Sequence, residues 1–345
     1  MMNSPKICAL IGLIAALPAI AFSAAAEYRV VARYLIGGDS GYYDYLRVDP
    51  AARRLYVSHE KRIEVLDADT GKKIGEVGPT TRAHGIALAP DTGHGFVTSG
   101  VDDQITMFDL KTLATLKAFK STGSNPDSIE YDPHSKKVYV GNHGSGDVTV
   151  IDPASGDVVA TIKLEGKLEG IAFDGRGQGY INAEDKSAVL VFDTKTFKPK
   201  ASWSVAPGEG GTGLAIDAAH HRIFSSCANN KVVVLDSDTG KVIATPAIGD
   251  DPDGLVFEPA TGLIFSSNVD GTLTIIHEDS PDKYTVRQNV KTGIGCKTIA
   301  LDEKTGRVIT SAPKYGPKPA PVKGGPKPKA PALPGTFEAI VVGLK

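Results

Sequence analysis

Residues 125–162 read NPDSIEYDPHSKKVYVGNHGSGDVTVIDPASGDVVATI, and this stretch decides the fold. It contains four short segments in which Val, Ile, Thr and Tyr alternate with other residues, and clusters of Asp, Asn, Pro, Ser and Gly separate the segments. Alternation with a period of two is typical of β-strands, and the separating residues are typical of tight turns. The stretch therefore predicts a four-stranded antiparallel meander.

The same unit recurs along the chain. A strand-like segment ends in a polar turn at intervals of 41 to 43 residues, at Asp67, Asp109, Asp152, Asp193, Asp236 and His277. A fixed period of this length indicates a repeat architecture. Small sheets cannot bury both faces alone, so they must stack, and a closed ring of four-stranded blades is a β-propeller. No helical periodicity stands out beyond residue 26, which predicts an all-β fold.

The number of blades follows from the length. Residues 27–345, without the Pro- and Lys-rich stretch at 314–335, hold close to seven periods of about 42 residues. The last unit supplies only three strands, ending in FEAIVVG (337–343), while YRVVARYLIG (28–37) is a spare strand. Pairing the two would remove the free edges. We expect one seven-bladed propeller domain over 27–345, closed by the N-terminal strand and interrupted by 314–335 in its last blade.

Residues 1–26 have the features of a signal peptide. Lys6 precedes an apolar run at 7–22, and small residues at 24–26 precede Glu27. We expect cleavage after residue 26 and a periplasmic or secreted protein whose mature chain has no membrane span. After cleavage two cysteines remain, Cys227 and Cys296, and since two blades separate them we expect no disulfide.

The segment KKVYVGNHGSGDVTVIDPASGDVVATI (136–162) resembles the repeat of the YVTN-type, or YncE-like, propellers, and the resemblance covers essentially all of 27–345. It implies a seven-bladed fold and a binding protein, which we expect to be a monomer that takes a small molecule or a protein at the propeller mouth. Single-stranded nucleic acid has been linked to a YncE-like propeller. We do not expect it here, because only Tyr42, Tyr43 and Tyr45 near Arg47 provide aromatic residues beside a basic one, and the formal net charge is −2.

A ring of residues is predicted at the channel mouth. The first strand of each blade begins, at the equivalent position, with Asp44, His84, Asp127, Glu169, Thr212, Asp253 or Lys297. Glycine follows four of these residues and serine follows one. Because the innermost strand of a propeller blade starts beside the central channel, we expect the seven side chains to surround one mouth and contact a ligand there.

Further candidates lie in the loops between the second and third strands, which join the same face. These loops carry His59, Asn142, His143, Glu184, Cys227 and Asn268. The turns between the first and second strands fall on the opposite face, and they hold His94, His134, His220 and His221.

The clustered carboxylates have three interpretations. Carboxylate oxygens bind hard divalent cations, so a metal site could include Glu169, Asp253, Asp127 and His84. Alternatively, the side chains accept hydrogen bonds from backbone amides of neighbouring blades and only fix the blade spacing. The third is a metal-dependent hydrolase or lactonase, because the Glu-Gly and Asp-Gly pairs at 169 and 253 resemble the inner-strand starts of gluconolactonase-type propellers. The ring lacks the Asn of those enzymes, and the sequence has no familiar catalytic motif.

Overall fold

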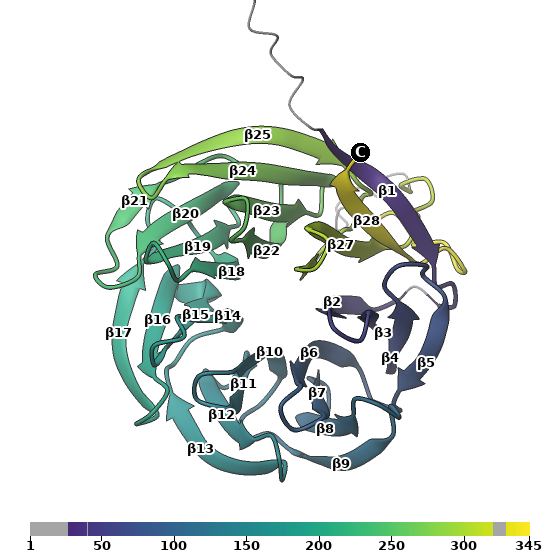
Figure 1. The fold of residues 1–345 in the computed structure, drawn as a ribbon, viewed down its shortest axis with the longest axis horizontal. Helices are drawn as coiled ribbons and strands as arrows, with labels where there is room; N and C mark the ends of the chain where they lie inside the picture. Colours follow the sequence, from purple (N-terminus) through teal and green to yellow (C-terminus); the bar gives the residue numbers. More distant parts are fainter. Residues whose placement is uncertain (1–26, 40, 320–328) are drawn as a thin grey trace, which may run out of the picture.

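The computed structural model describes residues 27–39, 41–319 and 329–345. The expected signal peptide and the centre of the Pro- and Lys-rich stretch, 320–328, lie outside the described residues. The strands form seven four-stranded antiparallel sheets arranged in a ring (Figure 1). This confirms the all-β, seven-bladed propeller that the 42-residue period predicts.

Each blade runs from an inner strand to an outer one. The inner strands are β2 (Tyr43–Asp49), β6 (Ala83–Ala89), β10 (Pro126–Asp132), β14 (Leu168–Phe173), β18 (Gly211–Asp217), β22 (Pro252–Glu258) and β26 (Ile299–Asp302). The second strands are β3 (Arg54–His59), β7 (His94–Ser99), β11 (Lys137–Asn142), β15 (Gln178–Ala183), β19 (Arg222–Cys227), β23 (Leu263–Asn268) and β27 (Arg307–Ala312). The third strands are β4 (Arg62–Asp67), β8 (Gln104–Asp109), β12 (Asp147–Asp152), β16 (Ala188–Asp193), β20 (Lys231–Asp236), β24 (Thr272–Ser280) and β28 (Glu338–Leu344). The outer strands are β5 (Lys73–Val77), β9 (Thr115–Lys120), β13 (Asp157–Lys163), β17 (Lys198–Ser204), β21 (Val242–Ala244), β25 (Lys283–Lys291) and β1 (Tyr28–Leu35), and a short 3-10 helix, η1, spans Glu184–Lys186.

The two ends of the chain close the ring in blade seven. Strand β1 pairs antiparallel with β28, in a register that runs from Tyr28 opposite Leu344 to Leu35 opposite Glu338. Figure 1 shows the two strands side by side. An ion pair of 2.6 Å between Arg33 Nη1 and Glu338 Oε1 joins them. The predicted closure by the N-terminal strand is therefore confirmed.

The apolar core lies between neighbouring blades. One cluster combines Tyr56 and Val65 of the first blade with Ile86 and Phe108 of the second, and all four side chains are at most 1% exposed. Alternation places every second residue of a strand on one face, so each sheet contributes apolar side chains to both of its neighbours. At about 25 cal/mol per Å² of apolar surface removed from water, this stacking is the main stabilising term.

The repeated aspartate at the end of the third strand forms the turn to the outer strand. Asp67 Oδ1 accepts hydrogen bonds from the amides of Asp69 and Thr70, at 3.2 and 2.8 Å, and from the Thr70 hydroxyl at 2.7 Å. The same arrangement recurs at Asp109, Asp193 and Asp236. An Asp side chain that satisfies its own turn amides explains why this residue marks the period.

The Pro- and Lys-rich stretch leaves the propeller between β27 and β28, as predicted. Hydrogen bonds of 2.8 Å join Gly316 to Pro331 and Leu333 to Lys314, so the ends of the stretch pair with each other. The Tyr315 hydroxyl lies 2.8 Å from the hydroxyl of Tyr43, on the first inner strand. The base of the stretch therefore lies next to the channel mouth.

Candidate functional site

A β-bulge places the ring residues in the channel. In blade four, Leu168 pairs with Ala183 and Ile171 pairs with Ile181. The chain therefore advances three residues along β14 where it advances only two along β15. Glu169 lies within this irregularity. Equivalent register shifts occur at the corresponding positions of β2, β6, β10, β18 and β22. A bulge leaves a residue unpaired and redirects its side chain, which explains how a charged residue can begin a core strand.

Glycine after the ring residue lets the next blade approach. A Cβ atom on Gly170 would lie 2.7 Å from both the amide nitrogen of Leu214 and the carbonyl oxygen of Thr212. A Cβ atom on Gly213 would lie 2.7 Å from the amide nitrogen of Leu255. At these two positions the backbones of successive bulges are therefore nearly in contact, and a side chain there would meet backbone atoms.

Hydroxyl groups fix the spacing of the blades. Ser128 donates to the carbonyl of Glu169, Thr98 to that of Asp127 and Thr298 to that of Asp44, each at 2.6 Å. In the part of the chain that the structure describes, the four ring carboxylates accept no hydrogen bond from a backbone amide. The spacing role thus belongs to Ser and Thr, and the ring carboxylates remain free for other contacts.

The ring surrounds a polar cavity of about 300 Å³. It is lined by Tyr42, Asp44, Tyr45, Arg82, His84, Asn125, Asp127, His143, Glu169, Asp253 and Lys297. Six of the seven predicted ring residues are present, while Thr212 instead donates to the carbonyl of Pro252 at 2.9 Å. Tyr45 and Asp253 also line a second cavity of about 480 Å³, whose walls include Leu46, Ile129 and Leu255, so they lie where the polar mouth meets the rest of the channel.

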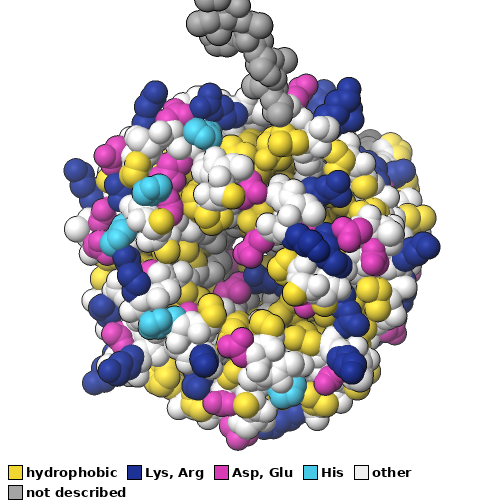
Figure 2. Space-filling model, viewed as in Figure 1, with side chains coloured by type: hydrophobic (Ala, Val, Ile, Leu, Met, Phe, Trp, Pro, Cys, Tyr) yellow, Lys and Arg dark blue, Asp and Glu magenta, His cyan; other side chains and the backbone are white. Residues whose placement is uncertain are grey.

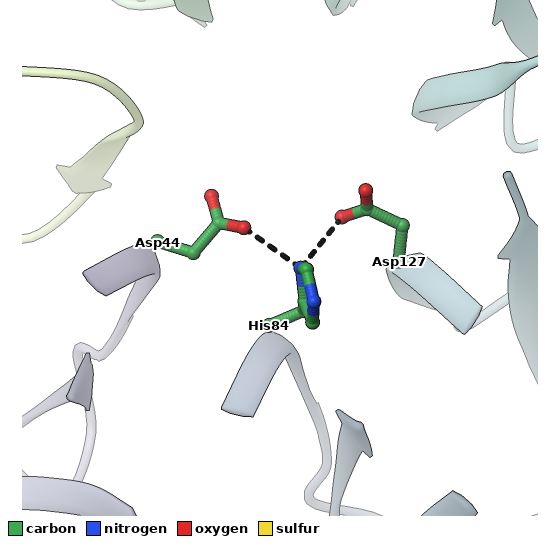
Figure 3. Close-up of side chains that lie close together, drawn as sticks. All are labelled: Asp44, His84 and Asp127. Atoms are coloured by element: carbon green, nitrogen blue, oxygen red, sulfur yellow. Dashed lines mark hydrogen bonds and ion pairs between the residues drawn. The ribbon is translucent and has the colours of Figure 1, made fainter. Parts of the chain in front are cut away.

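His84 is the centre of the first cluster in this cavity. Its Nδ1 atom lies 3.0 Å from Asp44 Oδ2 and 3.5 Å from Asp127 Oδ1 (Figure 3). The same atom lies 2.6 Å from the Tyr42 hydroxyl. The three ring residues come from β2, β6 and β10, which are neighbouring inner strands. One imidazole nitrogen therefore faces carboxylate oxygen atoms from the two blades on either side of its own.

The environment of His84 favours its charged form. His84 is only 6% exposed, and burial alone would lower the pKa of its imidazole. Hydrogen bonds to Asp127 and Asp44 more than offset burial, and the net effect raises the pKa of His84 to about 9. In the metal-free protein His84 is thus an imidazolium at neutral pH. A cation that binds here must replace its proton.

Glu169 is part of a second cluster on the other side of Asp127. Its Oε1 atom lies 2.8 Å from His143 Nδ1. Burial raises the pKa of Glu169 to about 7, with the contact to His143 opposing and Asp127 and Glu184 adding to the rise. The contact with Glu169 in turn raises the pKa of His143. Asp127 belongs to both clusters. Within each cluster, the three ligand atoms lie within 4.8 Å of one another.

Asp253 lies in the ring apart from both clusters. Burial, followed by the charges of Asp44 and Glu169, raises the pKa of Asp253 to about 8, while Lys297 opposes the rise. Lys297 Nζ lies 5.9 Å from the centre of the Tyr42 ring and 5.4 Å from that of Tyr43. The mouth therefore carries one carboxyl group that keeps its proton near neutral pH.

Most of the predicted loop residues serve the blades instead of the mouth. His143 lines the cavity, and the charge of Glu184 acts on Glu169. The other four are fully buried at the ends of second strands: His59, Asn142, Cys227 and Asn268. Their partners lie inside the fold, as when Asn142 donates to Asp147 at 2.8 Å and the His59 ring stacks on Phe337 at 4.4 Å.

The two cysteines of the described residues are both buried free thiols. Burial raises the pKa of Cys227 to about 11. A thiol of this kind is a poor nucleophile and a poor metal ligand at neutral pH. The expected absence of a disulfide agrees with the structure, and neither cysteine lines the polar cavity.

Sequence reasoning missed four residues that line the mouth: Tyr42, Tyr45, Arg82 and Asn125. Two of them contact each other. The Arg82 guanidinium carbon lies 3.8 Å from the centre of the Tyr42 ring, and the Tyr42 hydroxyl donates to Asp44 at 2.8 Å. Both residues come just before an inner strand, two positions ahead of a ring residue. The only signal for them was this spacing, since Arg and Tyr are common on any surface.

The predicted metal set is rearranged in the structure. His84 and Asp127 come together with Asp44, which the sequence analysis placed in the ring but not among the metal ligands. Glu169 instead joins Asp127 and His143, and Asp253 is in neither cluster. Both sets draw on consecutive blades, because inner strands that are neighbours in sequence are neighbours in the ring.

Comparison with known proteins assigns the family. The protein-family model described as "Outer membrane protein assembly factor BamB" matches residues 59–269, which is more than half of the chain. The chain belongs to this family. It also resembles the proteins named "Uncharacterized protein YncE" of Escherichia coli O157:H7, at 23% identity, and of Salmonella typhi, at 24%, over 200 residues that cover 54% of this chain and 55% of each relative. The chain thus spans about half the length of the curated relatives it matches, and the YncE-like character expected from its repeats is confirmed.

Solved structures share the fold. A chain of a mitotic checkpoint complex aligns over 90% of this chain and 96% of its own length, with a TM-score of 0.73 at 15% identity. A chain of Kuenenia stuttgartiensis hydrazine synthase aligns over 81% and 93%, with a TM-score of 0.66 at 18% identity. At such low identity the likeness shows the propeller architecture alone. Among the described residues, no helix is long and apolar enough to cross a membrane.

Proposed function

We propose that this chain is a binding protein of the cell envelope whose channel mouth holds a divalent cation, without catalysis. The observation that carries the proposal is the placement of His84 Nδ1 between carboxylate oxygens of Asp44 and Asp127. The ligand atoms of the three residues lie within 4.8 Å of one another. Zinc bonds to His nitrogen and carboxylate oxygen are about 2.0–2.2 Å long, so the ligand atoms of a tetrahedral site stand about 3.4 Å apart and small side-chain movements suffice.

The ligand types indicate which ions fit. Imidazole suits zinc and its neighbours among the transition metals, while carboxylates also accept manganese, magnesium and calcium. A site with one imidazole and two carboxylates favours Zn²⁺ or Mn²⁺ over Mg²⁺ and Ca²⁺. The Tyr42 hydroxyl, 2.6 Å from His84 Nδ1, is positioned to hold or replace a ligand at the same place.

The cavity has room for more than an ion. Its volume of about 300 Å³ is at the lower end of the range for small-molecule sites. Arg82 and Lys297 also line it and are positive, so an anionic group of a small molecule could complete the coordination of the cation. A small molecule bound together with the metal ion is therefore the partner that we propose for the mouth.

Two observations support a location in the cell envelope. Residues 1–26 have the pattern of a signal peptide, and the family description names an outer-membrane assembly factor. We infer a mature protein that begins near Glu27 and works in the periplasm.

A metal-dependent hydrolase is the second candidate, favoured by Glu169. A carboxyl group with a pKa of about 7, raised by burial, is suited to accept a proton at neutral pH. It lies beside Asp127, which the two clusters share. Turnover of lactones in a hydrolysis screen with added Zn²⁺ or Mn²⁺, lost in Glu169→Gln, would favour this candidate over simple binding.

Calorimetric titration with Zn²⁺ tests the proposed binding function. The full mature chain is prepared with EDTA and without a polyhistidine tag, and then the chelator is removed. We expect Asp127→Asn to weaken one binding event at least tenfold, or about 1.4 kcal/mol. Asp253→Asn is the matched control, because it removes a ring carboxylate outside both clusters and should leave that event unchanged. Equal affinities in the wild type and Asp127→Asn would contradict the proposal.

A further inference from the structure

A separate cluster of metal-binding side chains lies on the face opposite the mouth, between blades five and six. Asp217 is the last residue of β18, His220 lies in the turn to β19, and Glu278 lies on β24 of the next blade. Turns between first and second strands are on the far side from the second-to-third loops that reach the mouth. Figure 2 shows histidines gathered over the region of β20 and β24.

The three side chains converge closely. His220 Nδ1 lies 2.6 Å from Asp217 Oδ2 and 3.6 Å from Glu278 Oε1, and the three ligand atoms lie within 4.8 Å of one another. The other oxygen of Asp217 accepts the amides of Ala219 and His220, at 3.0 and 3.2 Å, and so fixes the turn. Asp217 Oδ2 is therefore held toward His220 by the same side chain that shapes the loop.

Glu278 supplies an independent sign that something is bound here. The residue is only 9% exposed, and its Oε2 atom is buried without a hydrogen-bond partner among the described residues, while Tyr284 donates to Oε1 at 3.2 Å. Leaving a buried carboxylate oxygen unpaired is costly. A bound ligand at this oxygen would remove the cost.

The charges nearby do not neutralise the two carboxylates. The guanidinium group of Arg222 donates to the carbonyl of His220 at 3.1 Å, but its ion pairs are with Asp236 at 3.1 Å and Asp282 at 3.0 Å. His220 is the remaining cationic candidate, and its side chain is 55% exposed.

We propose that Asp217, His220 and Glu278 form a second divalent-cation site, between blades five and six, that takes Zn²⁺ or a similar transition ion. Two buried carboxylates and one partly exposed imidazole supply three protein ligands and leave the outward positions to water or to another ligand. The site is independent of the channel mouth, because it shares no residue with the ring. An ion bound here would join two blades.

The test is a Zn²⁺ titration of the full mature chain that carries Asp127→Asn, which removes the mouth ligand. We expect this parent to keep one Zn²⁺-binding event at its wild-type affinity, and we expect His220→Asn and Glu278→Gln each to weaken that event at least tenfold. His221→Asn is the matched control, because His221 pairs with Asp238 at 2.6 Å outside the cluster and lies at a φ of 59°, which Asn tolerates. The His221→Asn variant should bind Zn²⁺ with the same affinity as its Asp127→Asn parent.

Thermal unfolding separates binding from folding. Gln at 278 resembles a protonated Glu, so in EDTA the Glu278→Gln protein should unfold near the temperature of its parent. Only the parent should gain thermal stability on addition of Zn²⁺. Absence of any binding event in the Asp127→Asn parent, or equal loss in His221→Asn, would overturn this proposal. Failure of the mouth site would instead appear as identical titrations of the wild type and Asp127→Asn.

Discussion

At the scale of the residue, the mouth is a set of titratable groups whose pKa values are shifted in one direction. His84, Glu169 and Asp253 have pKa values of about 9, 7 and 8, and each value is higher than that of the free group. These three groups together therefore bind more protons in the folded protein than in the unfolded chain between about pH 4 and pH 9. Stability falls with rising pH wherever the folded state binds the extra protons.

A pH series on His84→Gln checks this account. The stabilising contribution of His84 should be fully present below its unfolded pKa of about 6.5 and be lost as the pH rises through about 9. The loss should amount to roughly 3 kcal/mol at most. Urea unfolding of both proteins in EDTA at pH 6 and pH 9.5 should show a steeper decline for the wild type. Parallel declines would mean that His84 is neutral in the folded protein.

The sequence predicts residues of the mouth well only where a repeat marks them. The ring position at the start of the inner strand recurs once per blade, so Asp44, Asp127 and Asp253 could be aligned without coordinates. Tyr42 and Arg82 could not, since their contact with each other depends on loop conformations that do not repeat. The burial of His59 at a strand end, against Phe337 from the last blade, also depends on closure and could not be read from the neighbouring residues.

At the scale of the element, the decisive features are the bulge in six of the seven inner strands and the glycine that follows four of the ring residues. Successive bulges approach so closely that side-chain volume at the glycine must displace backbone. The strand periodicity predicts the inner strands themselves, but a two-residue alternation carries no sign of the extra residue. The register shift thus appears only in the structure.

Gly170→Ala tests this packing. The added methyl group would meet backbone atoms of Leu214 and Thr212 at 2.7 Å, so blade five must shift, and we expect a loss of about 1–3 kcal/mol in unfolding free energy. Gly293→Ala is the matched control, because its nearest contact is a side-chain methyl group of Ile340 at 3.4 Å. Urea unfolding of the two variants should differ by more than about 1 kcal/mol, and similar values would contradict the close approach of the bulges.

At the scale of the whole molecule, closure brings residues far apart in sequence to one mouth. Thr298 of the last blade donates to the carbonyl of Asp44 in the first, at 2.6 Å, and β1 completes the seventh sheet. The constant period made seven blades predictable from the sequence. Which carboxylates share a histidine was not predictable, because that depends on side-chain directions inside the closed ring.

Removal of β1 tests the importance of closure. A chain that begins at Ile36 should expose the edge of β28 and lose the Arg33–Glu338 ion pair, and we expect its thermal midpoint to fall by at least about 10 °C. Deletion of residues 320–328 is the control, because hydrogen bonds at 314–316 and 331–333 close the base of that stretch. Calorimetric scans that show equal midpoints for both deletions would argue against the closing role of β1.

The most direct test of the proposed function is an anomalous difference map from crystals of the mature protein soaked in Zn²⁺ and measured at the zinc absorption edge. We predict a peak within about 2.2 Å of His84 Nδ1 and of carboxylate oxygens of Asp44 and Asp127. A map that shows fully occupied zinc sites elsewhere in the protein, but no peak between these three side chains, would contradict a metal-binding mouth.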